Sequence, residues 1–257
     1  MLHELVEWKI AAIRRLDVDR DATAFAEQVL AHNPGPFRRA RPEPPPSSSP
    51  PDASDRLGAL ILARTQLRLI LELPEHVEQM LALAEDGHTE PHVRVALLHA
   101  LAYLVQPTEL VHDDAPGGYG YVDDCIVINT MRLALVRMGV PLGLDEARER
   151  RALSILALAL APDDFAKMQT LMTRTWNEIH LRHMTPAAVA TTQAERIHRR
   201  PLDLRYDRTT PVRPITCTYP QLSAGDVGVV GGDSVRIGFR DGEVIHATAE
   251  GSLHGHG

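Results

Sequence analysis

Apolar residues recur at intervals of three and four along most of the chain as far as residue 200, which is the period of amphipathic helices. The first stripe consists of Leu2, Leu5, Val6, Ile13 and Leu16. Together with a weaker stripe over 21–31, it predicts a pair of N-terminal helices within residues 1–32. Residues 33–54 are rich in Pro and Ser, a composition that favours an extended spacer over a packed core. We therefore expect the helix pair to be tethered to the rest of the chain.

The segment 55–200 repeats the helical pattern and predicts a helical body. Prolines mark several helix boundaries in this segment, because a proline ends a helix but is tolerated in the first helical turn. The predicted helices cover 55–73, 75–85, 91–106, 121–138, 145–161, 162–183 and 185–200. The helix at 145–161 is apolar on nearly all sides in its second half, which predicts a buried position.

The end of the chain changes to a period of two, which is typical of strands. From residue 201 we predict an extended connector at 201–224, a β element at 225–250 and a flexible tail at 251–257. Residues 235–239 and 243–248 alternate around Asp241-Gly242, a pair that favours a hairpin turn, and 227–230 supply a candidate third strand. The predicted fold class is mainly α: a multi-helix bundle with a small C-terminal antiparallel β-hairpin or three-stranded sheet.

Composition supports this prediction and narrows the function classes. Of 257 residues 44% are hydrophobic but only 4% are aromatic, so we expect a core of Leu, Val, Ile and Ala, which suits packed helices. A formal net charge of −7 argues against a nucleic-acid partner, because such binding depends on clustered Lys and Arg. The two cysteines, Cys125 and Cys217, make no disulfide framework and favour a reducing, cytoplasmic compartment. No apolar run reaches the roughly 20 residues of a transmembrane helix.

Acidic residues gather where the predicted helices 91–106 and 121–138 are joined, in a segment (103–124) that includes the end of the first helix and the start of the second and that we call the acidic hairpin. Its carboxylates are Glu109, Asp113, Asp114, Asp123 and Asp124. Helix capping explains one of them, but five repel one another unless something offsets their charge. Three interpretations stay open: capping with pairing to arginines, a surface for a basic partner, and a divalent metal site in which these five are the ligands and His112 is a candidate general base. Outside the metal interpretation we expect no cofactor.

The hairpin also carries a recognisable pattern: an apolar helix ending in Tyr-Leu, a loop with prolines, acids and glycines, and an Asp-Asp pair opening a second apolar helix. This pattern resembles the YkvA-like family, a small helical domain of unknown function found in many bacterial proteins. The matching positions are Tyr103, Leu104, Pro107, Glu109, Leu110, Asp113, Pro116, Asp123 and Asp124. The resemblance covers residues 90–138 and implies a helical hairpin, while the family has no settled biochemical activity.

These observations favour a cytoplasmic, non-catalytic interaction or scaffold protein that presents the acidic hairpin to a protein partner or to another copy of the chain. Tyr103, Tyr119 and Tyr121 are the candidate partner contacts. An alternative is a metal-dependent enzyme, with hydrolysis as the expected reaction, that uses the carboxylates at 109–124. A second alternative is a peripheral membrane-associated accessory protein that binds through its first helix.

Overall fold

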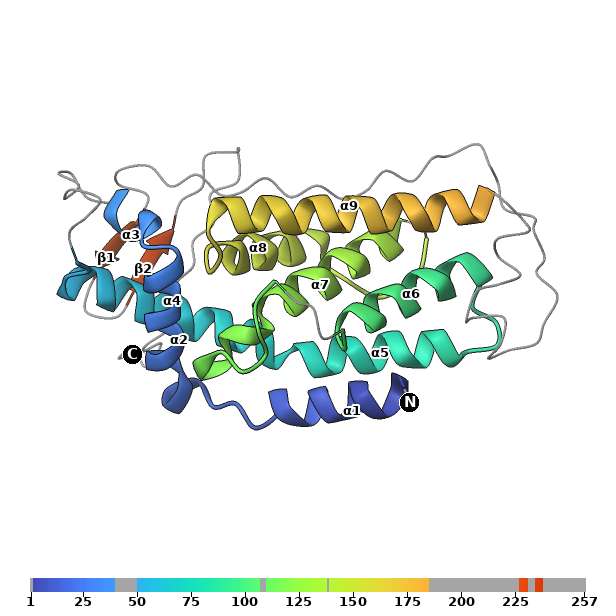
Figure 1. The fold of residues 1–257 in the computed structure, drawn as a ribbon, viewed down its shortest axis with the longest axis horizontal. Coiled ribbons are helices and arrows are strands. Elements are labelled where there is room, and N and C mark those ends of the chain that lie inside the picture. The colour runs from blue at the N-terminus through green and yellow to red at the C-terminus, as the bar shows by residue number, and fades with distance from the viewer. Residues whose placement is uncertain are drawn as a thin grey trace, which may run out of the picture.

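Helices dominate the part of the chain that the structure, a computed structural model, describes: residues 2–39, 50–106, 110–137, 139–184, 227–230 and 234–237 (Figure 1). In chain order the helices are α1 (Leu2–Ile13), α2 (Val18–His32), α3 (Gly35–Arg39), α4 (Ala53–Leu71), α5 (Leu73–Glu85), α6 (Pro91–Tyr103), the 3-10 helix η1 (Pro116–Tyr121), α7 (Val122–Arg137), α8 (Glu146–Ala157) and α9 (Pro162–Met184). The predicted mainly helical fold class is confirmed. None of these described helices combines the length and the apolar character needed to cross a bilayer.

Local sequence signals set the helix boundaries. The side chains of Asp17 and Asp145 each accept two hydrogen bonds from backbone N–H groups in the first turns of α2 and α8. Prolines occupy the first turns of α5, α6 and α9, where a missing N–H group costs no helical hydrogen bond. Glu72 alone separates α4 from α5, because Pro74 cannot continue α4. The observed helices therefore begin and end close to the predicted residues.

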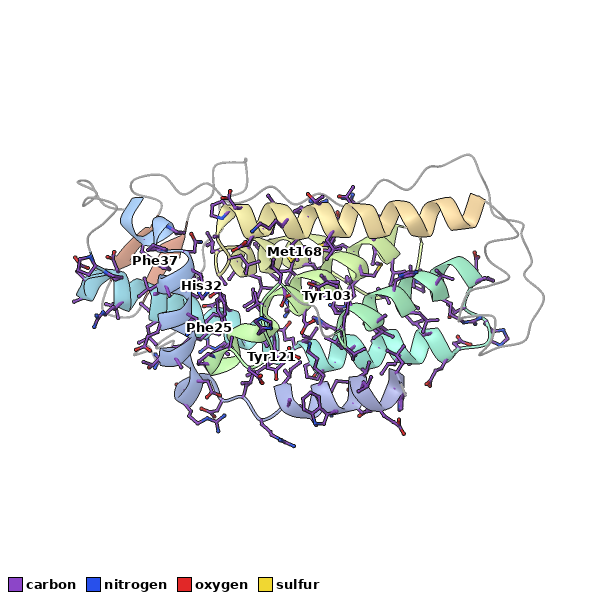
Figure 2. The ribbon with its side chains drawn as sticks, viewed as in Figure 1. Phe25, His32, Phe37, Tyr103, Tyr121 and Met168 are labelled. Atoms are coloured by element: carbon purple, nitrogen blue, oxygen red, sulfur yellow. The ribbon has the colours of Figure 1, made fainter. Side chains whose placement is uncertain are left out.

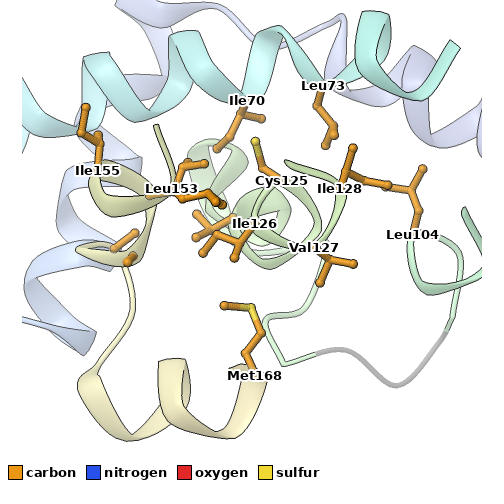
Figure 3. Packing of buried hydrophobic residues seen from close by; sticks show 14 of the residues in the cluster. Ile70, Leu73, Leu104, Cys125, Ile126, Val127, Ile128, Leu153, Ile155 and Met168 are labelled. Atoms are coloured by element: carbon orange, nitrogen blue, oxygen red, sulfur yellow. The ribbon is translucent and has the colours of Figure 1, made fainter. Parts of the chain in front are cut away.

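α7 lies at the centre of the bundle and packs against α4, α5, α6, α8 and η1. It is buried over nearly its whole length, including its polar residues Asp123, Asp124, Asn129 and Arg132. Figure 3 shows its aliphatic side chains enclosed by side chains of other helices, such as Ile70 of α4, Leu153 of α8 and Met168 of α9. Polar groups buried on α7 lose their water and must find partners inside the protein.

α1 and α2 belong to the same hydrophobic core as the later helices. Val6 and Ile10 of α1 are buried where this helix packs on α5 and α6, and Phe25 of α2 is buried where that helix packs on α4 and η1. In Figure 1, α1 runs along α5 at the outer edge of the bundle. The helix pair that we expected to be tethered is thus packed on the body, because each helix buries an apolar face there. The predicted spacer begins with α3, and residues 40–49 lie outside the described part.

Two short antiparallel strands, β1 (Val227–Val230) and β2 (Ser234–Ile237), are described near the end of the chain. Val227 pairs with Ile237, and Val230 with Ser234. The predicted hairpin turn at Asp241-Gly242 and its return strand lie outside the described residues. So do the predicted helix at 185–200, the connector and the tail. The prediction of a hairpin across Asp241-Gly242 therefore stays a prediction.

Candidate functional site

Glycines in crowded positions fix the turn of the acidic hairpin. Gly117 and Gly118 of η1 have φ angles of 68° and 81°, which other residues rarely adopt. A Cβ atom on Gly117 would lie 2.5 Å from the backbone nitrogen of Phe25, so η1 approaches α2 more closely than a side chain allows. A Cβ atom on Gly120 would collide with the carbonyl oxygen of His112. Glycine therefore permits η1 to pack against both α2 and the hairpin loop.

Tyr119 holds η1 in the core. Its ring packs edge-on against Phe25 at 5.5 Å and stacks on His32 at 5.2 Å between ring centroids. Its hydroxyl group donates to the carbonyl oxygen of Ala159 over 2.8 Å. Tyr119 was a candidate partner contact, but in this structure it is a buried packing residue.

Asp123 ties the two sides of the hairpin together from a fully buried position. One carboxylate oxygen, Oδ2, accepts hydrogen bonds from the Tyr103 hydroxyl (3.1 Å) and from the backbone N–H groups of Leu110 (3.2 Å) and Val111 (3.3 Å). Burial raises the pKa of Asp123, and the hydrogen bonds from Val111 and Tyr103 oppose that rise because they stabilise the carboxylate. Tyr103, also a candidate partner contact, is thereby occupied inside the protein.

The ammonium group of Lys9 lies between two other carboxylates of the hairpin. Nζ is 2.7 Å from Asp124 Oδ2 and 2.9 Å from Asp113 Oδ1. Lys9 is only 2% exposed and Asp124 is fully buried, whereas the Asp113 side chain is 31% exposed. The same Nζ lies 5.9 Å from the centre of the Tyr121 ring, in a cation–π arrangement. Figure 2 labels Tyr121 in the fold. Burial raises the pKa of Tyr121, and Asp113 raises it further. A buried ion pair thus joins α1 to the hairpin loop and to α7.

A metal ion in the hairpin would have to compete with Lys9, whose ammonium group already occupies the space between Asp113 and Asp124. Of the other predicted ligands, Asp123 is bonded to Tyr103 and the backbone, Asp114 is exposed, and Glu109 lies outside the described residues. Across the described ranges, no three His, Cys, Asp or Glu residues form a group that could hold a metal ion. The arrangement favours internal charge pairing, by a lysine where we expected arginines.

The part of the hairpin that is exposed to solvent is small. His112, the candidate base, and Asp114 are exposed, and Tyr121 is half-buried. The backbone carbonyl of His112 accepts a hydrogen bond from the N–H group of Ala115 over 2.9 Å, which closes a tight turn in this loop. Of the hairpin carboxylates that the structure describes, Asp123 and Asp124 therefore lie inside the fold, whereas Asp113 is partly exposed and Asp114 is exposed.

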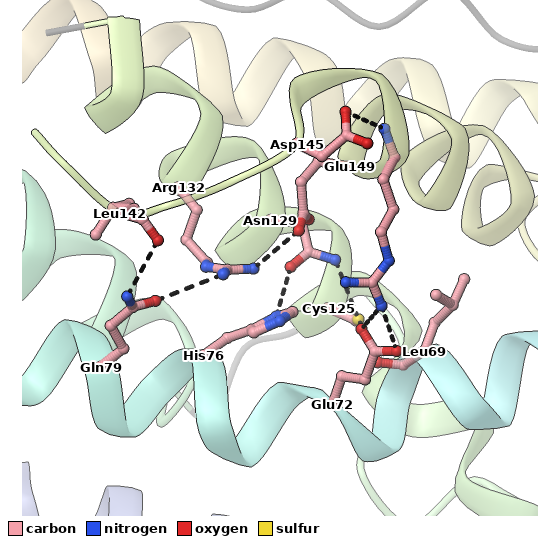
Figure 4. Close-up of polar contacts among 11 residues, drawn as sticks. Leu69, Glu72, His76, Gln79, Cys125, Asn129, Arg132, Leu142, Asp145 and Glu149 are labelled. Carbon is pink, nitrogen blue, oxygen red and sulfur yellow. Dashed lines mark hydrogen bonds and ion pairs between the residues drawn. The ribbon is translucent and has the colours of Figure 1, made fainter. Parts of the chain in front are cut away.

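A second polar cluster, further along α7, contains a cysteine, a histidine and an asparagine (Figure 4). The Nδ1–H group of His76 donates to Asn129 Oδ1 over 2.9 Å, and Asn129 Nδ2 donates to Cys125 Sγ over 3.7 Å. Burial raises the pKa of the Cys125 thiol, and Asp124 raises it further, so no thiolate is available as a nucleophile. Cys125 is therefore a packed residue of the core.

A buried ion pair lies next to these groups and connects α5, α7 and α8. Arg132 donates to Glu149 Oε1 over 3.4 Å and to Gln79 Oε1 over 3.5 Å, and Gln79 donates to the carbonyl oxygen of Leu142 over 3.3 Å. Burial lowers the pKa of Arg132 and raises that of Glu149, because each charged form loses hydration. The ion pair and its hydrogen bonds hold α5, α7 and α8 in register. Their role is therefore structural.

The sequence analysis did not single out five polar residues that the structure buries: Lys9, His76, Asn129, Arg132 and Glu149. Two signals were present. Lys9 falls on the buried face of α1, between Val6 and Ile13, where a lysine needs an internal partner. Asn129 and Arg132 follow Cys125 at spacings of four and three, which places all three on one face of a buried helix.

Comparisons with protein-family models, with curated proteins and with solved structures find no match for this chain. The YkvA-like resemblance therefore rests on the motif of the acidic hairpin alone.

Proposed function

We propose that the protein is a non-catalytic interaction protein, and that the outer face of α1 is the surface on which a protein partner docks. Trp8 carries the proposal: it is 67% exposed, although buried Lys9 on the next position fixes α1 to the core. Leu5, one turn earlier, is 46% exposed. An exposed tryptophan on a rigid helix is typical of interaction sites, because it buries a large apolar area with little loss of conformational entropy.

In this proposal the acidic hairpin acts from inside the protein. Asp113 and Asp124 hold Lys9, and Lys9 orients α1 so that Val6 and Ile10 face the core while Trp8 faces solvent. In this proposal the buried ion pair serves to define the arrangement of α1 rather than to add net stability. The carboxylates thus position the docking surface.

The charges around Trp8 indicate the chemistry of the partner. Glu4, Glu7 and Glu85 are exposed near the start of α1 and the end of α5, and Arg14 is paired with Glu78 over 2.6 Å. Electrostatic complementarity therefore favours a protein surface with an apolar hollow bordered by basic side chains. The same glutamates would be repelled by an anionic membrane surface, which weighs against the peripheral membrane alternative.

The finer predictions on location and family are part of this proposal. We propose a cytoplasmic location, supported by Cys125, a buried free thiol. We also propose membership of the YkvA-like family, supported by the buried Asp123-Asp124 pair at the start of α7 and its bond to Tyr103.

Photocrosslinking tests the docking surface. The full chain carries p-benzoylphenylalanine in place of Trp8, and a control chain carries it in place of exposed Ala166 on α9. We expect a protein adduct in cells from position 8 and much less from position 166. A lipid adduct at position 8, or equal protein adducts at both positions, would overturn the proposal.

Elemental analysis tests the non-catalytic part of the proposal. We expect the purified full chain to bind no stoichiometric divalent metal, and its melting temperature to ignore added Mg²⁺, Ca²⁺ or Mn²⁺. Stoichiometric metal that is lost in an Asp113→Asn variant would contradict the proposal and support the metal-dependent enzyme, because Asp113 is the more exposed carboxylate of the pair around Lys9.

A further inference from the structure

The outer face of α1 changes character along its length. The exposed residues at helical spacing on this face are Glu4, Leu5, Glu7, Trp8, Ala11 and Arg15. The N–H group of Arg15 donates to the carbonyl oxygen of Ala12 over 3.1 Å, so the helical turn continues to that residue. The face is therefore acidic at Glu4 and Glu7, apolar at Trp8 and Ala11, and basic at its end.

A second copy of α1, running antiparallel, is complementary to this face. When Trp8 of one copy lies opposite Ala11 of the other, Glu4 lies opposite Arg15. Both contacts form together because four residues, about 6 Å of helix, separate each pair of positions on its own helix. A two-fold axis repeats both contacts, as in any isologous interface. The small Ala11 side chain leaves room for the indole ring between the helices.

We infer that the partner of the docking surface is a second copy of this chain, joined through antiparallel α1 helices, an inference that rests on the proposed function. A parallel pair would place Glu4 against Glu4 and Arg15 against Arg15, which repel. The partner surface was expected to carry basic side chains beside its apolar part. In a second copy of α1, Arg15 supplies such a side chain. A contact between single helices is smaller than the roughly 1,200 Å² of a standard interface, so the dimer is weak and depends on concentration.

Sedimentation velocity of the full chain, from micromolar to millimolar concentration, measures this association. We expect Trp8→Ser, Glu4→Arg and Arg15→Glu each to raise the dimer dissociation constant by about tenfold or more, because each removes the apolar contact or sets like charges together. The matched control is Asp163→Arg, a charge reversal at an exposed position on α9, and it leaves the dissociation constant unchanged.

Mixing the two charge variants is the decisive measurement. Glu4→Arg and Arg15→Glu chains are each mismatched with themselves, yet in the antiparallel pair they match each other at both ends. We expect the mixture to form a heterodimer about as tight as the original homodimer. A mixture that stays monomeric, or a Trp8→Ser chain that still dimerises, would overturn the inference. If the chain is monomeric and position 8 crosslinks to a different protein, the inference of a second copy is wrong and the proposed function stands. Lipid crosslinks at position 8 would contradict the proposed function as well.

Discussion

Nζ of Lys9 in α1 lies 2.7 Å from a carboxylate oxygen of Asp124 in α7, and both side chains are almost wholly removed from water. Each charge loses hydration worth several kcal/mol on burial, so each depends on the other for compensation. Because α7 is the central helix and α1 an outer one, this pair determines how α1 is seated on the bundle.

Replacing Lys9 by Met is expected to lower the free energy of unfolding by about 3–5 kcal/mol, because Asp124 is left buried without its counter-charge. Urea denaturation followed by far-ultraviolet circular dichroism measures this loss. Adding Asp124→Asn to the Lys9→Met chain should recover part of it, since a neutral amide costs less to bury than a carboxylate.

Lys167 is the matched control for Lys9. It is the other lysine of the chain, and it pairs with Asp164 over 2.7 Å on the exposed side of α9. Lys167→Met should change the free energy of unfolding by less than about 1 kcal/mol, as is usual for surface ion pairs. Equal losses of unfolding free energy in the two lysine variants would show that burial does not make the Lys9 pair more important for stability than an exposed pair.

The helices could be predicted because their limits are local: Asp145 caps α8 and Pro91 opens α6 whatever lies beside them. The pairing of Lys9 with Asp124 could not, because it depends on α1 packing against a helix far along the chain. Likewise, Tyr119 and Asp114 lie in the same predicted loop, but only the packing of η1 against α2 buries the first and leaves the second exposed. The acidic hairpin was found from sequence, whereas the cation that neutralises it was not.

Gly117→Ala is expected to be strongly destabilising for two separate reasons. Its positive φ costs a non-glycine residue about 1–2 kcal/mol. Its Cβ atom would also meet the backbone of Phe25 at 2.5 Å, and such overpacking typically costs a further 1–3 kcal/mol or so. Thermal denaturation of the full chain measures the sum.

Gly143→Ala separates the two causes. Gly143 has a φ of 66°, but a Cβ atom on it would meet no atom within 4 Å, so only the conformational cost applies. We expect the melting temperature to fall clearly less in Gly143→Ala than in Gly117→Ala. Equal falls would mean that the close approach of η1 to α2 contributes nothing to stability.

His76 should make the stability of the protein depend on pH. Burial lowers its pKa from 6.5 to about 4, and the nearby positive charge of Arg132 adds to this lowering. Between these two values the unfolded chain takes up a proton that the folded protein does not, so the free energy of unfolding falls as the pH decreases through this window, by up to about 3 kcal/mol. His76→Gln should flatten this dependence.

His88, an exposed histidine, supplies the control for His76. Urea denaturation at several pH values between about 7 and 4.5 compares the original chain with His76→Gln and His88→Gln. We expect the slope to change only in the His76 variant. A His76→Gln chain that loses stability with acid as steeply as the original would rule out His76 as the cause.

The Arg132–Glu149 pair is expected to be strongly coupled because both side chains are only 5% exposed. Arg132→Met or Glu149→Leu alone leaves one buried charge and should cost about 3–5 kcal/mol, whereas the double variant should cost less than the sum, because neither charge remains. The Glu72–Arg148 pair, at 2.7 Å but with side chains 35% and 56% exposed, provides the comparison, with a coupling of about 1 kcal/mol or less. Double-mutant cycles measured by urea denaturation give both coupling energies. If the buried pair were coupled no more strongly than the exposed one, burial would not be what makes these charges depend on each other.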